Sequence, residues 1–214
     1  MKKHKFTLIF VLLCLMYLIG LTSQYYSFDE ARSIEKLHDI DKDSIEIIIR
    51  KDTHFGCVVL YKNHYNGNLG VTSIEYNFGL IKNSNGSTEI NVYDQEVPFH
   101  LLSNHNHNDK EIDQHVIGLY TNDKDIFYLV FGPKSDMLEE KLKEVNMNLE
   151  TFRNENPEHL IEPVVNGYAL LLDDAYSVNR WNSYVFDKNG KLIASKIAGT
   201  GDAVYVKNSE ETNE

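Results

Sequence analysis

The sequence predicts an α+β fold, in which an N-terminal membrane helix precedes one domain built on an antiparallel sheet of about seven to nine strands with one or two packed helices. Three observations support this class. Short β-rich segments alternate with Gly, Asn and Asp turns, and two stretches space their apolar residues as helices do. No internal repeat or Pro/Ser-rich linker interrupts residues 28–206. The alternative is a split into two sub-domains near residues 94–114.

Two segments of this domain are expected to be helical. Ser27 and Glu30 form a capping box, and a helix follows until the acidic stretch Asp39–Asp43 ends it. Ser135 is expected to cap the second helix. Apolar residues recur at helical spacing behind it, namely Leu138, Leu142, Val145, Leu149 and Phe152.

Strands are expected where β-branched and aromatic residues gather between turn signals. They fall at residues 45–50, 55–61, 69–82, 89–93, 115–120, 126–131, 167–172, 180–186, 192–197 and 203–206. A bulge near Gly79 would allow the long third segment, and Asn85-Gly86 and Asn189-Gly190 are each expected to turn a hairpin. Two polar stretches, 94–114 and 154–166, are expected to be irregular, and the acidic tail 207–214 to be disordered.

The N-terminus has the pattern of a membrane-targeting segment. Lysines at positions 2, 3 and 5 precede an uncharged, largely apolar run from Phe6 to Thr22. As a helix this run would be roughly 25 Å long, a little short of the bilayer's hydrocarbon core of about 30 Å. Because the basic residues lie before the run, the N-terminus is expected in the cytoplasm and residues 24–206 outside.

Residues 1–23 are therefore expected to be a signal peptide or a membrane anchor. We favour an uncleaved, single-pass anchor, because the residues before the best cleavage point, after Thr22, fit signal peptidase only passably. The alternative is a protein secreted after cleavage of this segment.

The charge of the chain limits its partners. The formal net charge is −11, and three of the lysines lie in residues 1–23, so the exported part is more acidic still. Such a domain repels nucleic acid and anionic lipid surfaces. We expect contact with the membrane through the N-terminal segment, a protein or envelope partner outside, and no nucleic acid.

The cysteines give no framework for a disulfide. Cys14 lies in the apolar run, which leaves Cys57 as the one cysteine of the exported domain. Cys57 sits in an apolar strand and is expected to be a small buried hydrophobe rather than a nucleophile. An exported domain without disulfides, rich in Lys, Asn and Ile, is typical of Gram-positive bacteria.

The histidine-rich stretch is the first candidate site. His100, His105, His107 and His115 stand among several acidic residues. In a strand, the two histidines of His105-x-His107 would point to one side and could share a zinc, copper or nickel ion. The alternative is a solvated polar loop, and no other cofactor is predicted.

Arg180 and Trp181 form the second candidate site. Trp181 is the only tryptophan of the chain. With the aromatic residues that follow it, Trp181 could form an exposed binding patch. We favour its packing into the core, since strand aromatics are usually buried on one face.

Several segments resemble the uncharacterised small membrane-anchored extracytoplasmic proteins of Gram-positive bacteria. These are the basic anchor, Ser27–Ala31, Val116–Tyr120 with Ile126–Val130, and Asp187–Ile193. The resemblance spans most of residues 1–196 and implies export and an α+β fold. It implies no chemistry, and it does not include the histidine-rich stretch.

The sequence fixes no biochemical activity. We expect a non-enzymatic binding or interaction module of the cell envelope, because the domain is anchored, acidic and poor in motifs. Envelope metal binding through residues 100–115 is one alternative. An unrecognised hydrolase is the other, although no triad, phosphate loop or paired-carboxylate motif is evident.

Overall fold

The computed structural model of the chain describes residues 2–22, 26–77, 81–92, 97–108, 112–133, 148–173, 181–197 and 202–206. This part contains three helices and thirteen strands, mostly in antiparallel sheets, which confirms the predicted α+β class. The chain divides into two compact units, Met1–Glu89 and Ile90–Glu214.

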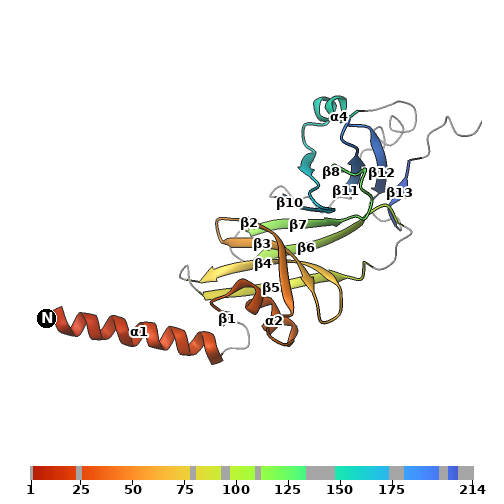
Figure 1. The fold of residues 1–214 in the computed structure, drawn as a ribbon. Helices are drawn as coiled ribbons and strands as arrows, with labels where there is room; N and C mark the ends of the chain where they lie inside the picture. Colours follow the sequence, from red (N-terminus) through yellow and green to blue (C-terminus); the bar gives the residue numbers. More distant parts are fainter. Residues whose placement is uncertain are drawn as a thin grey trace, which may run out of the picture. The chain divides into compact units, whose positions relative to one another are not determined.

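The first unit contains one five-stranded sheet (Figure 1). Its strands have the order β1-β5-β4-β3-β2, so the meander from β2 to β5 is extended by β1 at the edge. Its elements are α1 (Lys2–Thr22), β1 (Tyr26–Ser27), α2 (Glu30–His38), β2 (Ile45–Asp52), β3 (Gly56–Asn63), β4 (Leu69–Asn77) and β5 (Ile81–Ile90).

Helix α1 contains the predicted anchor segment. Its described side chains, from Phe6 to Leu18, are nearly all exposed. Across the residues that the structure describes, no helix has the length and apolar character needed to cross a bilayer. The membrane role of residues 1–23 stays a prediction.

Helix α2 is capped by Asp29 and not by Ser27. The Asp29 carboxylate accepts the Arg32 amide at 2.9 Å, whereas the Ser27 hydroxyl accepts the amide of Asp29 itself. The helix ends at His38 because Asp39 adopts a left-handed φ of 53°. The predicted cap is therefore wrong by two residues, and the predicted end is confirmed.

The buried face of α2 packs on the first unit's sheet. Ile34 lies in one apolar cluster with Cys57, Tyr61 and Ile74 of the strands. Cys57 is fully buried, as a small core hydrophobe should be, and this confirms the prediction from its strand.

The second unit contains two sheets. We call β10-β7-β6 the second sheet and β13-β12-β11-β8-β9 the third sheet. Their strands are β6 (His100–Asn108), β7 (Ile112–Tyr120), β8 (Tyr128–Pro133), β9 (Leu160–Pro163), β10 (Tyr168–Asp173), β11 (Trp181–Phe186), β12 (Leu192–Ile197) and β13 (Val204–Tyr205), and helix α4 is Leu149–Glu155.

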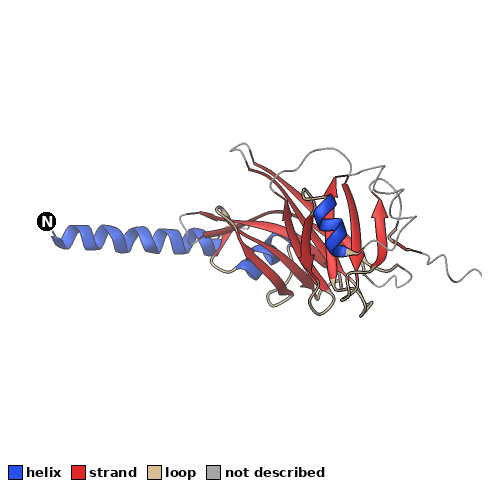
Figure 2. Cartoon of the chain, turned by 90° about the horizontal axis from the view of Figure 1, so that it is seen from above, coloured by secondary structure: helices blue, strands red, loops and turns tan. Residues whose placement is uncertain are grey.

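The third sheet is covered on both faces. On one face, Leu129 and Val185 share a buried cluster with Leu119 of the second sheet. On the other face, Tyr184 and Phe152 of helix α4 pack together, and Figure 2 shows α4 lying across the strands. Neighbouring residues Tyr184 and Val185 thus serve opposite faces, as the alternation of a strand requires.

The number of sheets differs from the sequence prediction. We expected one sheet of about seven to nine strands, whereas the described residues form three sheets. The pairings β7–β10 and β8–β11 join strands that are far apart along the chain. Local patterning carries no information about such long-range pairing, so the division into sheets could not be derived from it.

The polar stretch 94–114 was predicted to be irregular, and this is wrong for residues 100–108 and 112–114. Residues 100–108 form β6, which pairs with β7 from His100↔Tyr120 to Asn108↔Ile112. The polar side chains of β6 do not predict a strand. The strand forms because its backbone pairs with the more apolar strand β7. Residues 154–166 likewise contain the short strand β9.

The two predicted Asn-Gly hairpins have different outcomes. Gly190 turns the chain between β11 and β12 with a φ of 79°, as predicted. Gly86 also has a φ of 79° but lies inside β5, where its carbonyl accepts the Thr72 hydroxyl of β4. The predicted bulge near Gly79, the start of the second helix (residues 135–147) and the tail 207–214 lie outside the described residues.

Packing of α4 on the third sheet gives a first test. Phe152 is fully buried there, so Phe152→Ala should lower the free energy of unfolding by about 3–5 kcal/mol. Urea denaturation followed by the fluorescence of Trp181 reports on this unit. The matched change Phe127→Ala removes a ring that is 39% exposed and should cost much less; equal losses would contradict the packing.

Candidate functional site

The predicted histidine set is only partly brought together. His105 and His115 are cross-strand partners on β6 and β7, with ring centroids 6.4 Å apart. His100 lies five residues before His105 on β6, roughly 16 Å away, and stacks on Tyr120. The backbone of His107 pairs with Asp113, but its side chain lies outside the described residues.

The second predicted site converges on the first. Arg180 lies outside the described residues. Trp181 packs against Phe131 with ring centroids 5.0 Å apart, and its ring lies 6.2 Å from that of His115. The structure therefore joins Trp181, His115 and Phe131 in one aromatic cluster between the second and third sheets, and the exposed His105 contacts it through His115.

Burial governs the chemistry of His115. The residue is 3% exposed, and burial lowers its pKa to about 4, although Asp173 nearby opposes the shift. The imidazole is therefore neutral at physiological pH. Within the described residues, no group of three or more His, Cys, Asp or Glu could hold a metal ion. The zinc, copper or nickel site stays a prediction.

A second buried histidine lies on the opposite face of the third sheet. The His159 ring packs against Phe152 and lies directly over Gly132, where a Cβ atom would approach the ring to 2.3 Å. Burial lowers the pKa of His159 as well, while Glu158 nearby opposes the shift. His159 thus acts as an aromatic packing residue, which explains the glycine in strand β8.

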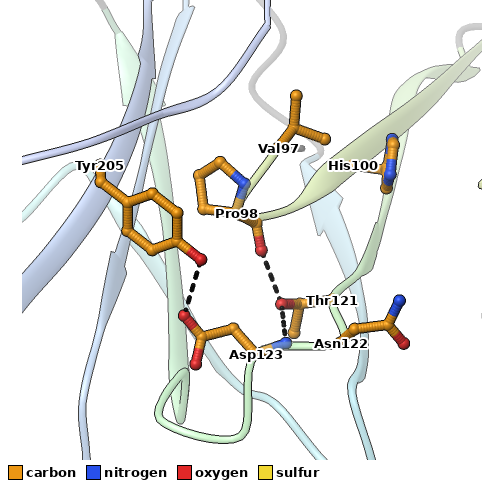
Figure 3. Close-up of a pocket in the computed structure, with 7 residues that line it drawn as sticks. All are labelled: Val97, Pro98, His100, Thr121, Asn122, Asp123 and Tyr205. Carbon is orange, nitrogen blue, oxygen red and sulfur yellow. Dashed lines mark hydrogen bonds between the residues drawn. The ribbon is translucent and has the colours of Figure 1, made fainter. Parts of the chain in front are cut away.

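A hollow of about 240 Å³ opens at the end of the second unit where β6 starts and β7 ends (Figure 3). Polar groups of several elements line it together with one exposed aromatic ring. The lining residues are Val97, Pro98, His100, Thr121, Asn122, Asp123 and Tyr205.

Thr121 fixes the floor of this hollow. Its hydroxyl donates to the Pro98 carbonyl at 2.7 Å and accepts the Asp123 amide at 3.0 Å. The Thr121 amide donates to the carbonyl of Gly167, which has a φ of 84° in the turn between β9 and β10. A Cβ atom at Gly167 would come within 2.5 Å of the Thr121 carbonyl oxygen, so this close approach requires glycine.

The bond between Tyr205 and Asp123 defines the wall of the hollow. The Tyr205 hydroxyl donates to Asp123 Oδ2 at 3.0 Å across a separation of 82 residues. Asp123 Oδ1 accepts the Asp125 amide at 2.9 Å. Burial and the Asp123 carboxylate raise the pKa of Tyr205. Both carboxylate oxygens thus accept a hydrogen bond, while Tyr205 as a residue stays 52% exposed.

A larger hollow of about 580 Å³ adjoins the first, since Asp123 and Tyr205 line both. It continues over the hairpin between β11 and β12. There Asp187 Oδ1 accepts the amides of Asn189 and Lys191, each at 2.8 Å, so side-chain hydrogen bonds hold the turn. The two hollows form one polar surface with a fixed backbone at this end of the second unit.

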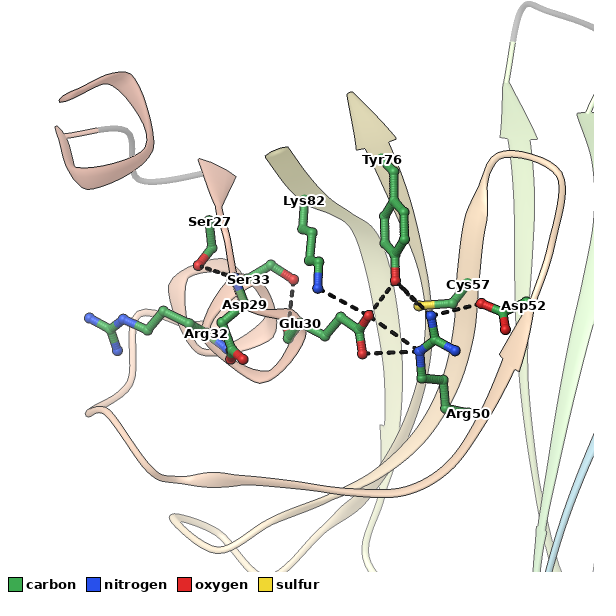
Figure 4. A network of polar contacts seen from close by, with 10 residues as sticks. All are labelled: Ser27, Asp29, Glu30, Arg32, Ser33, Arg50, Asp52, Cys57, Tyr76 and Lys82. Atoms are coloured by element: carbon green, nitrogen blue, oxygen red, sulfur yellow. Dashed lines mark hydrogen bonds and ion pairs between the residues drawn. The ribbon is translucent and has the colours of Figure 1, made fainter. Parts of the chain in front are cut away.

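A polar cluster in the first unit has a structural role (Figure 4). Glu30 of α2 accepts hydrogen bonds from Tyr76 and, at 3.2 Å each, from Lys82 Nζ and Arg50 Nε. Burial alone would raise the pKa of Glu30, but Tyr76 and Lys82 outweigh it and the pKa is lowered. The cluster joins α2 to three strands.

Cys57 borders this cluster without being activated by it. The Tyr76 hydroxyl lies 3.4 Å from the Cys57 sulfur, and burial raises the pKa of the thiol. A nucleophilic cysteine needs the opposite shift. The sequence interpretation of Cys57 as a core residue agrees with this environment.

A second carboxylate in the first unit organises a turn. Glu89 accepts hydrogen bonds from Tyr61, Asn63 and Asn66 at 3.1, 3.0 and 2.9 Å. Burial acts to raise the pKa of Glu89, but Asn63, Asn66, His38 and Tyr61 together outweigh burial and the pKa is lowered. Glu89 thereby fixes the turn between β3 and β4, which is again a structural task.

Sequence reasoning missed the residues that line the hollows. The sequence prediction left residues 121–125 as a connection between two strands and made 203–206 a last strand, with no binding role for either. The closeness of Asp123 and Tyr205 depends on the pairing of β13 with β12, which no local signal reveals. The Asp187–Lys191 turn was identified, but only as a hairpin.

Comparison of this chain with known protein families, curated proteins and solved structures gives no match. The function must therefore be argued from the geometry of the hollows and clusters themselves.

The burial of His115 predicts a pH dependence of stability. Its folded pKa of about 4 lies below the ordinary value of 6.5, so the unfolded chain binds the proton more readily and stability falls as the pH drops through this window. Between about pH 7 and about pH 5 the loss from His115 should be roughly 2 kcal/mol. His159 adds to the loss in the same direction.

The check is urea unfolding by Trp181 fluorescence at several pH values. His115→Phe should flatten the dependence in part, and His115→Phe with His159→Phe should flatten it further. His54→Phe changes an exposed ring and should leave the slope as it was. An unchanged slope in the double variant would contradict burial of the two neutral imidazoles.

Proposed function

We propose that this chain is a non-enzymatic binding module of the cell envelope. Its ligand site would be the surface around the Tyr205–Asp123 bond, where the two hollows meet. The observation that carries the proposal is this junction, at which an exposed aromatic ring is held by a fixed carboxylate between two hollows. Ligand sites are usually concave and combine aromatic or apolar surface with a few convergent polar groups.

The hydrogen bonding of the hollow favours binding over catalysis. Thr121 is 4% exposed, and its hydroxyl donates its proton to the Pro98 carbonyl and accepts the Asp123 amide. A nucleophile must be able to reach the reacting atom of its substrate, and this hydroxyl is buried in the floor of the hollow. We therefore prefer a binding role to the hydrolase alternative.

The location of the module is part of the proposal. The basic N-terminus and the apolar run 6–22 support insertion with residues 24–206 outside the cell, in a single-pass arrangement. The acidic exported part supports an uncharged or protein-like envelope partner rather than nucleic acid. Secretion after cleavage of residues 1–23 is the alternative.

Substitutions that place charges in the apolar run 6–22 test the proposed membrane location of the protein. Leu12→Arg with Leu13→Arg places two cations at its centre, at a cost of about 2.5–3.5 kcal/mol each. In a Gram-positive host, the natural chain should sediment with membranes and be cut by protease added to intact cells. The double variant should lose both properties.

Asp41→Arg, at an exposed position of the first unit, is the control and should behave as the natural chain. The mass of the exported protein separates anchoring from cleavage. A natural chain found in the cytosolic fraction would refute the proposed location.

Retention on cell-wall material tests the binding role. The full chain, in detergent, is mixed with insoluble wall material from which detergent has removed the lipid, so that anchoring cannot cause retention. Tyr205→Ala removes the exposed ring and should weaken retention by about tenfold. Tyr65→Ala removes a tyrosine ring that is 72% exposed in the first unit and should not. Equal retention of all three proteins would refute the site.

A further inference from the structure

The chemistry of the two hollows suggests the class of ligand. We infer that they bind an uncharged polysaccharide, with one sugar ring stacked on Tyr205 and the neighbouring sugars lying over the hairpin between β11 and β12. This inference rests on the proposed binding function and specifies its ligand.

The shape of the surface suits a chain of small rigid units. The hollow of about 240 Å³ lies below the range of roughly 300–1,000 Å³ that is usual for drug-sized ligands, so a unit as small as one sugar ring suits it better than a larger organic ligand. The larger hollow of about 580 Å³ continues from the same two residues. A ligand that extends across both would have repeated units.

The lining groups match the two kinds of surface on a sugar. A pyranose ring has an apolar face of C–H groups and a rim of hydroxyls. Tyr205 and Phe127 supply exposed aromatic faces, one at the junction and one in the larger hollow. Asn122, Asp123 and Asn189 supply amide and carboxylate groups at the edges, where hydroxyls would be.

The charge of the surface favours a ligand without net charge. The larger hollow combines Asp123, Asp125 and Asp187 with Lys124, Lys188 and Lys191. Three acids and three lysines thus line this hollow, although acidic residues outnumber basic ones by 32 to 21 in the chain. The smaller hollow has Asp123 and no lysine or arginine among its lining residues, which disfavours phosphates and other anions.

The surface is also held in place before any ligand arrives. Asp187 fixes the hairpin turn, Thr121 fixes the floor, and Tyr205 is held by Asp123. Groups that are already ordered lose little conformational entropy on binding, which helps a ligand that offers mainly hydroxyl contacts.

Two neutral tetrasaccharides, chitotetraose and cellotetraose, provide the test. Each is titrated into the full chain by calorimetry in a polyoxyethylene detergent, because detergents with sugar headgroups would compete. At least one should bind with a dissociation constant of about 1 mM or tighter and displace the chain from lipid-free wall material. Tetralysine is the cationic comparison and an oligomer of glycerol phosphate the anionic one. Neither should bind the chain or displace it from wall material.

Three variants separate stacking from structure. Tyr205→Ala should weaken tetrasaccharide binding by about tenfold, whereas Tyr205→Phe keeps the ring and should change it by about threefold or less. Tyr65→Ala should have no effect. Unfolding followed by Trp181 fluorescence verifies that each variant is folded.

The outcomes distinguish this inference from the proposed function. If retention on wall material depends on Tyr205 but neither tetrasaccharide competes, the polysaccharide inference is overturned and the binding function stands. If tetralysine or the glycerol phosphate oligomer displaces the chain from wall material instead, the polysaccharide inference is also overturned and the binding function stands. If retention does not depend on Tyr205, the proposed site itself falls.

Discussion

Leu129 and Val185 of the third sheet pack against Leu119 of the second sheet, while Tyr184 packs against Phe152 on the other face. This two-sided burial of the third sheet is the constraint on which the second unit depends. It fixes β8 and β11 in register, and the turns that follow β7 and β11 are fixed with them. The hollows lie between those turns, so their shape follows from the core beneath.

The short edge strand β13 completes the surface. Its two residues pair with β12, and the Val206 amide donates to the Ile193 carbonyl at 2.9 Å. Two ladder positions alone would hold such a strand weakly. The hydrogen bond from Tyr205 to Asp123 adds a link to the turn after β7, so one contact both secures the end of the described chain and presents an aromatic ring.

Two partly buried carboxylates of the first unit must be stabilised by hydrogen bonds. Glu30 and Glu89 are each surrounded by several donors, and these partners offset the cost of removing a carboxylate from water. Glu30 joins α2 to the sheet, and Glu89 holds the turn after β3. Both carboxylates are therefore held by side chains of the first unit itself and have structural roles there.

Local chemistry predicted what depends on neighbouring residues. The end of α2 at Asp39, the hairpin at Gly190, the burial of Cys57 and the strand status of most apolar segments all follow from sequence within a few positions. The pairing of β6 with β7 and the meeting of Trp181 with His115 do not, because they arise from contacts between distant segments.

The candidate site could not be predicted from the sequence for the same reason, because it too arises from contacts between distant segments. Histidines and a tryptophan are conspicuous because of their chemistry, but the structure gives Trp181 and His115 packing roles and leaves His105 exposed. Thr121, Asp123 and Tyr205 are ordinary turn and strand residues until the fold brings them together. These three residues line the hollow because the fold brings them close together, and their residue types alone do not predict a site.

The most direct measurement is hydrogen–deuterium exchange of the full chain with and without lipid-free wall material. If the hollows are the binding surface, the wall material should slow exchange at the amides of residues 121–125, 187–191 and 204–206, whose backbone surrounds both hollows. Exchange in the first unit should stay the same. Slowing confined to the first unit, or to the cluster of His105, His115 and Trp181, would contradict the account.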